Sequence, residues 1–405
     1  MSEVAQVTHS SPDGHIPQLR FPQFSHDWAI STIGNLAKID TGNRDTQDRV
    51  NSGKYPFYVR SNTVERINEY AFDGEAILTS GDGVGVGKNF HYVVGKFNYH
   101  QRVYSIHNFT NSTNGKFIYY YFADKFYRRV SRLSAKNSVD SVRMSMISDM
   151  PISIPAKPEQ QKIAAFLTAV DNKIEQLSKK QELLGEYKKG LTQQIFSQAI
   201  RFKAGDGSDF PDWEEKKLGN ISNVSKLAGY EFTKYIKYQD TGSIIALRGL
   251  NIKKNKLDLS VVKFIDNSDF SRLNRSKLFI DDLMFTYIGT IGEVALIDED
   301  DKYYLAPNVS RIRFNNEVCL PRFAIQYFNR EVFKQGEIKK YVSSSSQPAL
   351  TMGNVRLFIL NLPTKPEQQK IANFLSSIDS KIEQVGEQLD KSKQFKKALL
   401  QKMFV

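Results

Sequence analysis

The segment that begins at residue 155 has the sequence PAKPEQQKIAAFLTAVDNKIEQ, and it returns at residue 363 as PTKPEQQKIANFLSSIDSKIEQ, 208 residues later. Between residues 155–196 and 363–404, half of the 42 aligned positions are identical. A repeat of this length indicates that one structural unit is used twice. We therefore expect the task of the protein to be carried out twice as well.

Each copy of this segment has the pattern of a long helix. Pro158 suits the first turn, where its missing N–H has no cost, and Glu159 suits the positive end of the helix dipole. Apolar residues then recur at alternating spacings of four and three, which is typical of a coiled-coil seam. The predicted seam residues are Ile163, Leu167, Val170, Ile174 and Leu177 in the first copy, and Ile371, Leu375, Ile378, Ile382 and Val385 in the second.

Helices of roughly 40 residues would be about 60 Å long, which is more than a neighbouring domain of about 150 residues would cover. We therefore expect the two helices to pair with each other in an antiparallel coiled coil and to leave faces for a partner. The alternative is that each helix packs only on the core of its own domain.

The opening of each copy is repeated too. Phe21, Trp28 and the run IGNL at residues 33–36 return as Phe210, Trp213 and LGNI at residues 218–221. The offset is 185 residues at the tryptophans and 208 at the helices, so the second interior is 23 residues longer. Between opening and helix, short β-branched and aromatic runs separated by Gly, Asn and Asp predict strands. The opening and the helix, which together we call the frame, are copied, and the contents, the sequence between them, are not.

These patterns predict an α+β protein with a pseudo-twofold internal repeat, in which two globular mixed domains are separated by the paired helices. The predicted parts are a disordered leader over residues 1–20, a domain over 21–154, a helix over 155–202, a linker over 203–209, a second domain over 210–362 and a second helix over 363–405.

Composition narrows the class of protein. The formal charge of +12 and the pI near 9.4 favour an acidic partner such as nucleic acid. Cys319 is the only cysteine, which excludes internal disulfides and cysteine-based zinc sites and suits a reducing cytoplasm. The first twenty residues lack the pattern of a signal peptide, and nowhere do 18 apolar residues run together. We expect a cytoplasmic protein without a membrane partner.

No stretch of the chain has the pattern of a catalytic or metal site. The glycine-rich run at residues 81–88 fits neither the P-loop nor the dinucleotide spacing, so we interpret it as a strand turn that could approach a DNA phosphate. All six histidines lie in the first copy, so a task performed by both copies cannot depend on a histidine. We predict no catalytic residue, no metal ligand and no cofactor-binding residue.

Basic and aromatic residues are interleaved in both domain interiors, as expected for contacts with phosphates and base edges. In each interior an arginine and an asparagine follow a strand-like run, and these side chains suit guanine and adenine geometrically; a solvated turn would use the same residues. The candidate DNA-binding residues are Arg44, Arg60, Asn62, Lys88, Arg102, Arg128, Arg129, Lys234, Lys237, Arg248, Asn251, Lys253, Lys254 and Arg275.

The duplicated PxKPEQQKIA with its long helix, the similar openings and the run SSSSQPAL at residues 343–350 resemble the specificity subunit of Type I restriction-modification enzymes. The resemblance covers nearly everything after residue 20. The first copy departs from it at residues 137–141, where the Ser-Gln-Pro-Ala pattern is not kept.

The resemblance implies a non-catalytic reader of double-stranded DNA, with one target recognition domain for each half of a bipartite, asymmetric sequence. The helices would dock two modification subunits, which in such families carry S-adenosylmethionine and methylate adenine, while restriction subunits translocate and cut the DNA. Two alternatives remain at this point: a DNA enzyme acting alone, and a scaffold that does not touch nucleic acid.

Overall fold

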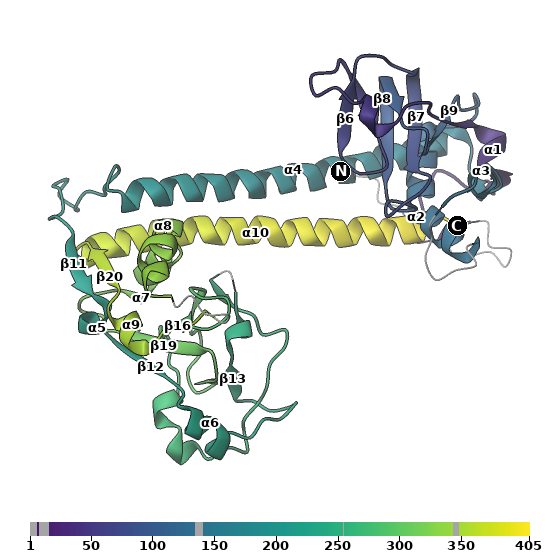
Figure 1. The fold of residues 1–405 in the computed structure, drawn as a ribbon. Coiled ribbons are helices and arrows are strands. Elements are labelled where there is room, and N and C mark those ends of the chain that lie inside the picture. Colours follow the sequence, from purple (N-terminus) through teal and green to yellow (C-terminus); the bar gives the residue numbers. More distant parts are fainter. Residues whose placement is uncertain (1–5, 8–15, 134–140, 254, 343–347) are drawn as a thin grey trace. The chain divides into compact units, whose positions relative to one another are not determined.

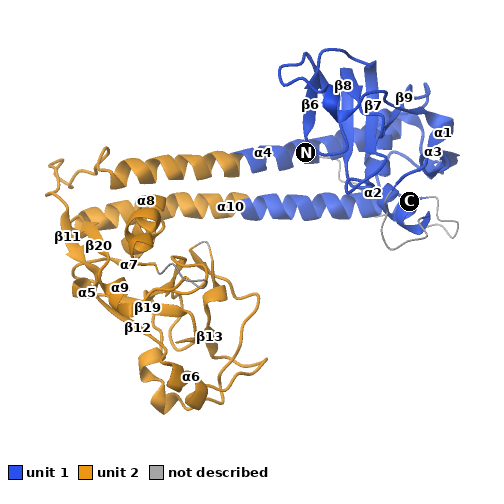
Figure 2. Cartoon of the chain, in the orientation of Figure 1, with its two compact units in different colours: residues 1–179, 386–405 blue, residues 180–385 orange. Residues whose placement is uncertain are grey.

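The computed structural model describes residues 6–7, 16–133, 141–253, 255–342 and 348–405. The chain divides into two compact units (Figure 2). Unit 1 comprises residues 1–179 and 386–405, and unit 2 comprises residues 180–385. Each unit therefore contains one half of each long helix, because the divisions fall within the two repeated segments. None of the helices in the described parts of the chain combines the length and apolar composition that a membrane span requires.

Unit 1 is built on a six-stranded sheet with the order β4-β9-β7-β8-β5-β6 (Figure 1). All neighbours are antiparallel except β5 and β8. The strands are β4 (Lys38–Thr41), β5 (Tyr55–Tyr58), β6 (Val64–Ile67), β7 (Phe72–Ser80), β8 (Phe90–Tyr99) and β9 (Val103–His107). Helix α2 (Gly115–Leu133) packs against the sheet through aromatic pairs such as Phe90 with Phe122. The strands predicted from β-branched and aromatic runs in this interior are confirmed.

Unit 2 has a smaller, four-stranded antiparallel sheet with the order β12-β19-β16-β17. Its strands are β12 (Ser222–Lys226), β16 (Leu283–Thr286), β17 (Val294–Leu296) and β19 (Val309–Phe314). Unit 2 also has two separate two-stranded sheets, parallel β13 (Ile245–Leu247) with β18 (Tyr303–Leu305) and antiparallel β14 (Ile252–Lys253) with β15 (Lys256–Leu257). The helices are α6 (Gly229–Tyr235), α7 (Pro321–Phe328) and the short α8 (Glu331–Phe333). The extra residues of the second copy thus lie in an interior of different architecture.

The two units share a frame around these different sheets. In unit 1, α1 (Ile33–Leu36) packs on α3 (Met144–Ser148), and β3 (Ala29–Thr32) pairs with β10 (Pro151–Ile154). In unit 2, α5 (Leu218–Ile221) packs on α9 (Met352–Arg356), and β11 (Glu214–Lys217) pairs with β20 (Ile359–Leu362). The prediction of a copied frame with different contents is confirmed.

One glycine in each frame permits the close approach of the two short helices. A Cβ added to Gly34 would lie 3.1 Å from the Ser148 Cβ, and one added to Gly219 would lie 3.0 Å from the Arg356 Cβ. Ser148 and Arg356 are themselves 208 residues apart, so the same contact is made twice. This contact explains why the IGNL and LGNI runs are repeated.

The long helices are α4 (Lys157–Phe196) and α10 (Lys365–Met403). In unit 1, Asp171 of α4 pairs with Lys396 of α10 at 2.5 Å, and in unit 2, Lys188 of α4 pairs with Asp379 of α10 at 2.6 Å. Asp171 and Asp379 are equivalent in the repeat, as are Lys188 and Lys396. One contact made twice with its partners exchanged is the signature of a twofold interface. The predicted pairing of the helices is therefore confirmed.

The helix ends lie in the cores of the units. The core of unit 1 contains Ile163 and Leu167 from α4 together with Leu399 and Met403 from α10. The core of unit 2 contains Ile195 and Phe196 from α4 together with Ile371 and Leu375 from α10. The alternative in which each helix packs only on its own domain is therefore wrong. All ten predicted seam residues, Ile163, Leu167, Val170, Ile174, Leu177, Ile371, Leu375, Ile378, Ile382 and Val385, are buried or half-buried.

The predicted leader is partly structured. β1 (Gln6–Val7) pairs with β2 (Leu19–Arg20) in an antiparallel arrangement, and the Arg20 side chain is buried. The expectation of a disordered segment over the whole of residues 1–20 is wrong at its end, because Arg20 has a buried partner 139 residues further along the chain.

Candidate nucleic-acid interface

The glycine-rich run of unit 1 forms the turn between β7 and β8. Gly83 and Gly87 have positive φ values of 76° and 65°, which favour glycine. A Cβ at Gly85 would lie 2.2 Å from the Asn89 side chain and 2.8 Å from the carbonyl oxygen of Arg60. The run is therefore the strand turn that was predicted, and its glycines bring backbone close to the segment that carries Arg60.

Two of the candidate arginines meet at this turn. Arg60 Nη1 lies 3.1 Å and Arg102 Nε 3.8 Å from the carboxylate of Asp82. Their side chains are 48% and 65% exposed, so one carboxylate is shared by two cations that remain accessible. The ammonium of Lys88 lies 5.7 Å from the ring centroid of Tyr127. Because one acid cannot neutralise two guanidinium groups, this turn carries an excess of positive charge suited to a phosphate.

His100 is a buried residue that contacts the backbone of Arg102. It is 1% exposed, and its Nδ1 accepts a hydrogen bond of 2.8 Å from the backbone N–H of Arg102. Burial lowers the pKa of His100, although the nearby Asp45 carboxylate opposes the shift. The neutral ring positions the backbone of Arg102, and the charge of the turn comes from its arginines.

The remaining candidates of unit 1 differ in availability. Asn62 and Arg128 are exposed, and Arg44 is ion-paired with Glu69. Arg129 donates hydrogen bonds to the carbonyl oxygens of Met146 and Asp149, at 2.8 and 2.9 Å. The Arg129 guanidinium therefore holds the segment around α3, and its contact with DNA stays a prediction.

The equivalent turn of unit 2 joins β16 to β17. Gly289 and Gly292 have positive φ values of 79° and 90°. The backbone N–H of Leu350 donates to the carbonyl of Tyr287, as the N–H of Val142 donates to that of Gly81 in unit 1. The two glycine turns therefore occupy the same place in the frame.

A cavity of about 350 Å³ lies beside this second turn and is lined by Tyr238, Arg248, Gly289 and Asn308, among others. Arg248 donates from Nη2 to the carbonyl of Val261, and its buried Nε has no partner among the described residues. Arg248 is therefore the candidate of unit 2 that faces a recess beside the glycine turn.

Asn251 is not available for a base contact. It is fully buried, and its amide nitrogen donates to the carbonyls of Asp258 and Val261 at 2.8 and 2.9 Å. Its amide oxygen accepts from the backbone N–H of Arg248 at 3.1 Å. Asn251 shapes the turn that presents Arg248, so the prediction that it contacts DNA is wrong.

The other described candidates of unit 2 lie on the surface. Lys234, Lys237, Lys253 and Arg275 are exposed, and Lys253 pairs with Asp258 at 2.7 Å. Lys254 lies outside the described residues. Within the described part of the chain, no group of three or more His, Cys, Asp or Glu side chains could hold a metal ion.

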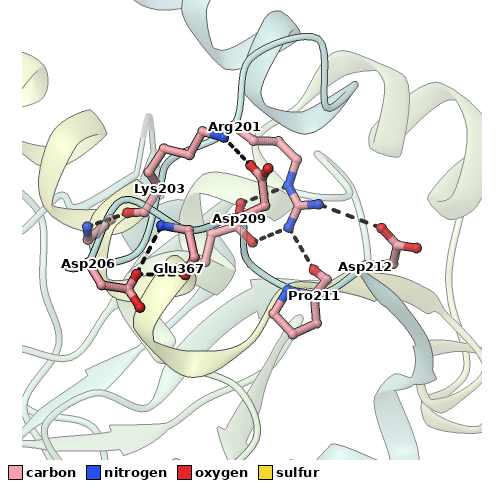
Figure 3. A network of polar contacts seen from close by, with 9 residues as sticks. Arg201, Lys203, Asp206, Asp209, Pro211, Asp212 and Glu367 are labelled. Carbon is pink, nitrogen blue, oxygen red and sulfur yellow. Dashed lines mark hydrogen bonds and ion pairs between the residues drawn. The ribbon is translucent and has the colours of Figure 1, made fainter.

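A buried ion pair in each unit was missed from the sequence. In unit 2, Arg201 Nη2 lies 2.8 Å from Glu367 Oε2 (Figure 3). Trp213 Nε1 donates to the same oxygen at 3.2 Å. Arg201 also donates to the carbonyl of Pro211 at 2.7 Å. The hydrogen bond with Glu367 raises the pKa of Arg201. Glu367 is fully buried at the start of α10, so this cluster joins the opening of the domain to the helix.

Unit 1 repeats this cluster with Arg20, Glu159 and Trp28. Arg20 Nε lies 2.7 Å from Glu159 Oε1, and Trp28 Nε1 donates to the same oxygen at 3.4 Å. Glu159 was interpreted as a residue that stabilises the helix dipole, yet it is 2% exposed. The signal available in the sequence was that the only two tryptophans and the only two PEQQ runs are repeated together.

The first glutamine of each PEQQ run has an internal role too. The Gln160 side chain accepts from the N–H of Asn114 at 2.8 Å and donates to the carbonyl of Ser112 at 3.0 Å. Gln368 accepts from Leu320 at 2.8 Å and donates to Val318 at 2.9 Å. These bonds hold the loops that precede α2 and α7, so this part of the repeated motif serves the frame.

The structure matches the openings of the two copies differently from the sequence alignment. Phe21 packs edge-on against Phe166 with ring centroids 5.7 Å apart, and the equivalent Phe374 has Phe202 at the same distance. Phe202, next to Arg201, therefore takes the place that the alignment gave to Phe210. Repeat alignment failed here because the chain between the arginine and the tryptophan has a different length in each copy.

Comparison with known proteins gives the same two copies as the sequence repeat. The family model described as the Type I restriction modification DNA specificity domain matches residues 25–184 and again residues 211–391. The crystal structure of the S subunit of a Type I restriction-modification system from M. genitalium has a similar fold, with a TM-score of 0.67 and 17% sequence identity over 96% of this chain and 99% of that one.

Two curated relatives have the same description. The MjaVIII specificity subunit of Methanocaldococcus jannaschii is 24% identical, with 93% of this chain and 91% of that protein covered. The EcoDI specificity subunit of Escherichia coli is 28% identical, but the match spans 43% of this chain and only 38% of that protein. With most of the chain matched by the family model in two places, this protein belongs to the specificity subunits of Type I restriction-modification systems, the non-catalytic components that recognise DNA.

Proposed function

We propose that this specificity subunit recognises a bipartite, asymmetric sequence in double-stranded DNA, with one half-site for each unit. The observation that carries the proposal is that the glycine turns occupy equivalent places in one frame, while the residues around them differ. Arg60, Lys88 and Arg102 surround the turn of unit 1, and Arg248 lies beside that of unit 2. A symmetric dimer would select a palindrome, whereas two unlike readers in one chain select a split, asymmetric target.

The helix pair is proposed to set the number of base pairs between the half-sites. Seven residues inserted near Leu184, with seven near its equivalent Ser392, would keep the heptad seam and lengthen the pair by about 10 Å. At about 3.4 Å per base pair, the spacer in the methylated sequence should grow by up to roughly three pairs. An unchanged spacer in methylation-site sequencing would contradict this role.

Two modification subunits are the proposed partners of the helices. Tyr187 of α4 and Phe395 of α10 are equivalent in the repeat, and they are 56% and 52% exposed. A large exposed aromatic residue is typical of an interface anchor, and its presence at both equivalent positions suits two copies of one partner. Restriction subunits would complete the complex, with S-adenosylmethionine bound by the modification subunits. We place this assembly in the cytoplasm.

Reconstitution tests the proposal. The full-length chain is incubated with S-adenosylmethionine and genomic DNA from a strain that lacks the system, with and without the modification subunit. We expect adenine methylation only when both proteins are present, at one split sequence. Methylation by the chain alone would instead indicate a DNA enzyme, and a complex that assembles but shows no affinity for DNA would indicate a scaffold.

A further inference from the structure

Unit 2 contains a groove that the recognition of DNA does not explain. It has a volume of about 610 Å³ and lies between the second half of α4, the end of α7 and α8. Its lining includes Gly185, Lys189, Phe196, Gln326, Arg330 and Val332. The side chain of Val332 is 75% exposed, so an apolar residue stands open at the edge of the groove.

Arg330 is the unusual residue of this groove. Its guanidinium carbon lies 3.7 Å from the ring centroid of Tyr327 and 4.5 Å from that of Phe196. Its Nε donates to the carbonyl of Tyr327 at 3.2 Å, and burial lowers its pKa. Among the described residues no carboxylate forms an ion pair with Arg330. A largely desolvated guanidinium without an acid is a favourable place for a carboxylate from another molecule.

The acids near the groove are already engaged. Asp379 accepts two hydrogen bonds from Lys188, at 2.6 and 2.8 Å, and a third from Gln326 at 3.0 Å. The Glu331 carboxylate accepts from Gln335 at 2.7 Å. Lys189, which also lines the groove, is exposed. With Lys188 paired to Asp379, the cations Lys189 and Arg330 outnumber the one remaining acid of the lining, Glu331, so the groove has a net positive charge that complements an acidic segment.

Gly185 leaves room for that segment. It lies within α4, where glycine is less stable than alanine, and a Cβ added to it would meet nothing within 4 Å. The equivalent position of α10 is Lys393. A glycine at the wall of a groove lets the backbone of a second helix approach closely. Gly190 has equally open surroundings but does not line the groove, so it is a matched control.

The corresponding recess in unit 1 is lined by Tyr121 and by other cations, Lys125, Arg128, Arg129 and Arg132. Tyr121 and Tyr327 are equivalent, because each contacts the phenylalanine that ends a long helix, Phe404 or Phe196. Three residues later the chain has Asp124 in unit 1 and Arg330 in unit 2. The Asp124 carboxylate lies 3.6 Å from Lys125. Both recesses are therefore basic, and the feature found in unit 2 is a guanidinium stacked on the equivalent tyrosine, where unit 1 has Asp124.

We propose that this groove receives an acidic amphipathic helix of a modification subunit, with a carboxylate on Arg330 and the helix backbone against Gly185. The inference rests on the docking of modification subunits proposed above. It adds that the two docking places differ, because the one on unit 2 has Arg330 stacked on Tyr327 where unit 1 has Asp124. Loss of the groove should then release one modification subunit and leave the other.

The test measures how many modification subunits bind to the full-length chain. Native mass spectrometry of the wild-type complex is compared with that of Arg330→Gln and Gly185→Leu, and with the controls Gly190→Leu and Asp124→Asn. Both groove variants should hold one modification subunit at concentrations where the wild type and both controls hold two, with affinity for the second at least about tenfold weaker. Gly185→Leu is the decisive variant, because an added side chain on an open helix face does not disturb the core.

Three results would overturn the inference. First, the Gly185→Leu variant could bind two modification subunits, as the Gly190→Leu control does. The docking proposal would then stand, but the groove would have no part in it. Arg330→Gln could retain both subunits and lose DNA affinity, which would assign the groove to phosphate. Finally, the wild-type chain could bind no modification subunit, in which case the docking proposal itself fails.

Discussion

Unit 1 and unit 2 have the same frame around different contents. Unit 1 has a six-stranded sheet and a 19-residue α2, whereas unit 2 has a four-stranded sheet and an eight-residue α7. The positions that match are those that contact the long helices or close the frame, such as Glu159 and Glu367 or Gly34 and Gly219. The comparison teaches that contact with the helices constrains the sequence, while the residues that face a target are free to differ.

The largest effect should come from exchanging the contents of one unit. Replacing residues 21–154 by the first domain of another specificity subunit leaves α4, α10 and unit 2 in place. We expect a complete change of one half-site and no change in the other, because each mismatched base pair costs about 1–3 kcal/mol independently at separated positions. Sequencing of methylated adenines checks this, and alteration of both half-sites would show that the units do not read separately.

The next largest effect should come from breaking the buried ion pair of each unit, and the two variants should lose different amounts of stability. Glu159→Ala leaves Arg20 buried and unpaired, which costs about 3–5 kcal/mol. Glu367→Ala should cost less, because the Arg201 side chain is 20% exposed whereas that of Arg20 is 3% exposed. Urea unfolding measures the loss of stability in both variants, with Glu175→Gln on the exposed face of α4 as the control. Equal losses would mean that solvent does not reach Arg201.

Much of the frame could be predicted from the sequence, because its signals are local or repeated. The seam residues from Ile163 to Leu177 follow a heptad period, and the repeat itself shows which residues belong together. The buried ion pair could not be predicted, because Arg20 and Glu159 are 139 positions apart in the sequence and meet only after the chain between them has folded. Asn251 failed as a DNA contact for a related reason. Its type suits a base, but its bonds to the chain's own carbonyls follow from the tertiary fold.

The frame glycines should give a smaller and matched effect. Gly34→Ala and Gly219→Ala each place a Cβ about 3 Å from a neighbouring helix, which costs about 1–3 kcal/mol by overpacking. Gly190→Ala, with nothing within 4 Å of the new Cβ, should instead stabilise the protein by up to about 1 kcal/mol. Thermal unfolding distinguishes the two signs. If Gly34→Ala left the stability unchanged while Gly219→Ala lowered it, the two frames would not be packed alike.

The smallest effect concerns the ion pair that is made twice between the helices. Double-mutant cycles on Asp171 with Lys396 and on Asp379 with Lys188 should each give a coupling of about 0.2–1 kcal/mol, because all four side chains are partly exposed. Asp171→Asn alone should cost more than Asp379→Asn, since Asp171 also accepts a 2.8 Å bond from the Tyr120 hydroxyl, where Asp379 has only the amide of Gln326. If the two coupling energies are equal but the two single variants lose different amounts of stability, the twofold contact is preserved while its surroundings have diverged. A coupling present in one cycle and absent in the other would show that the divergence has reached the helices themselves.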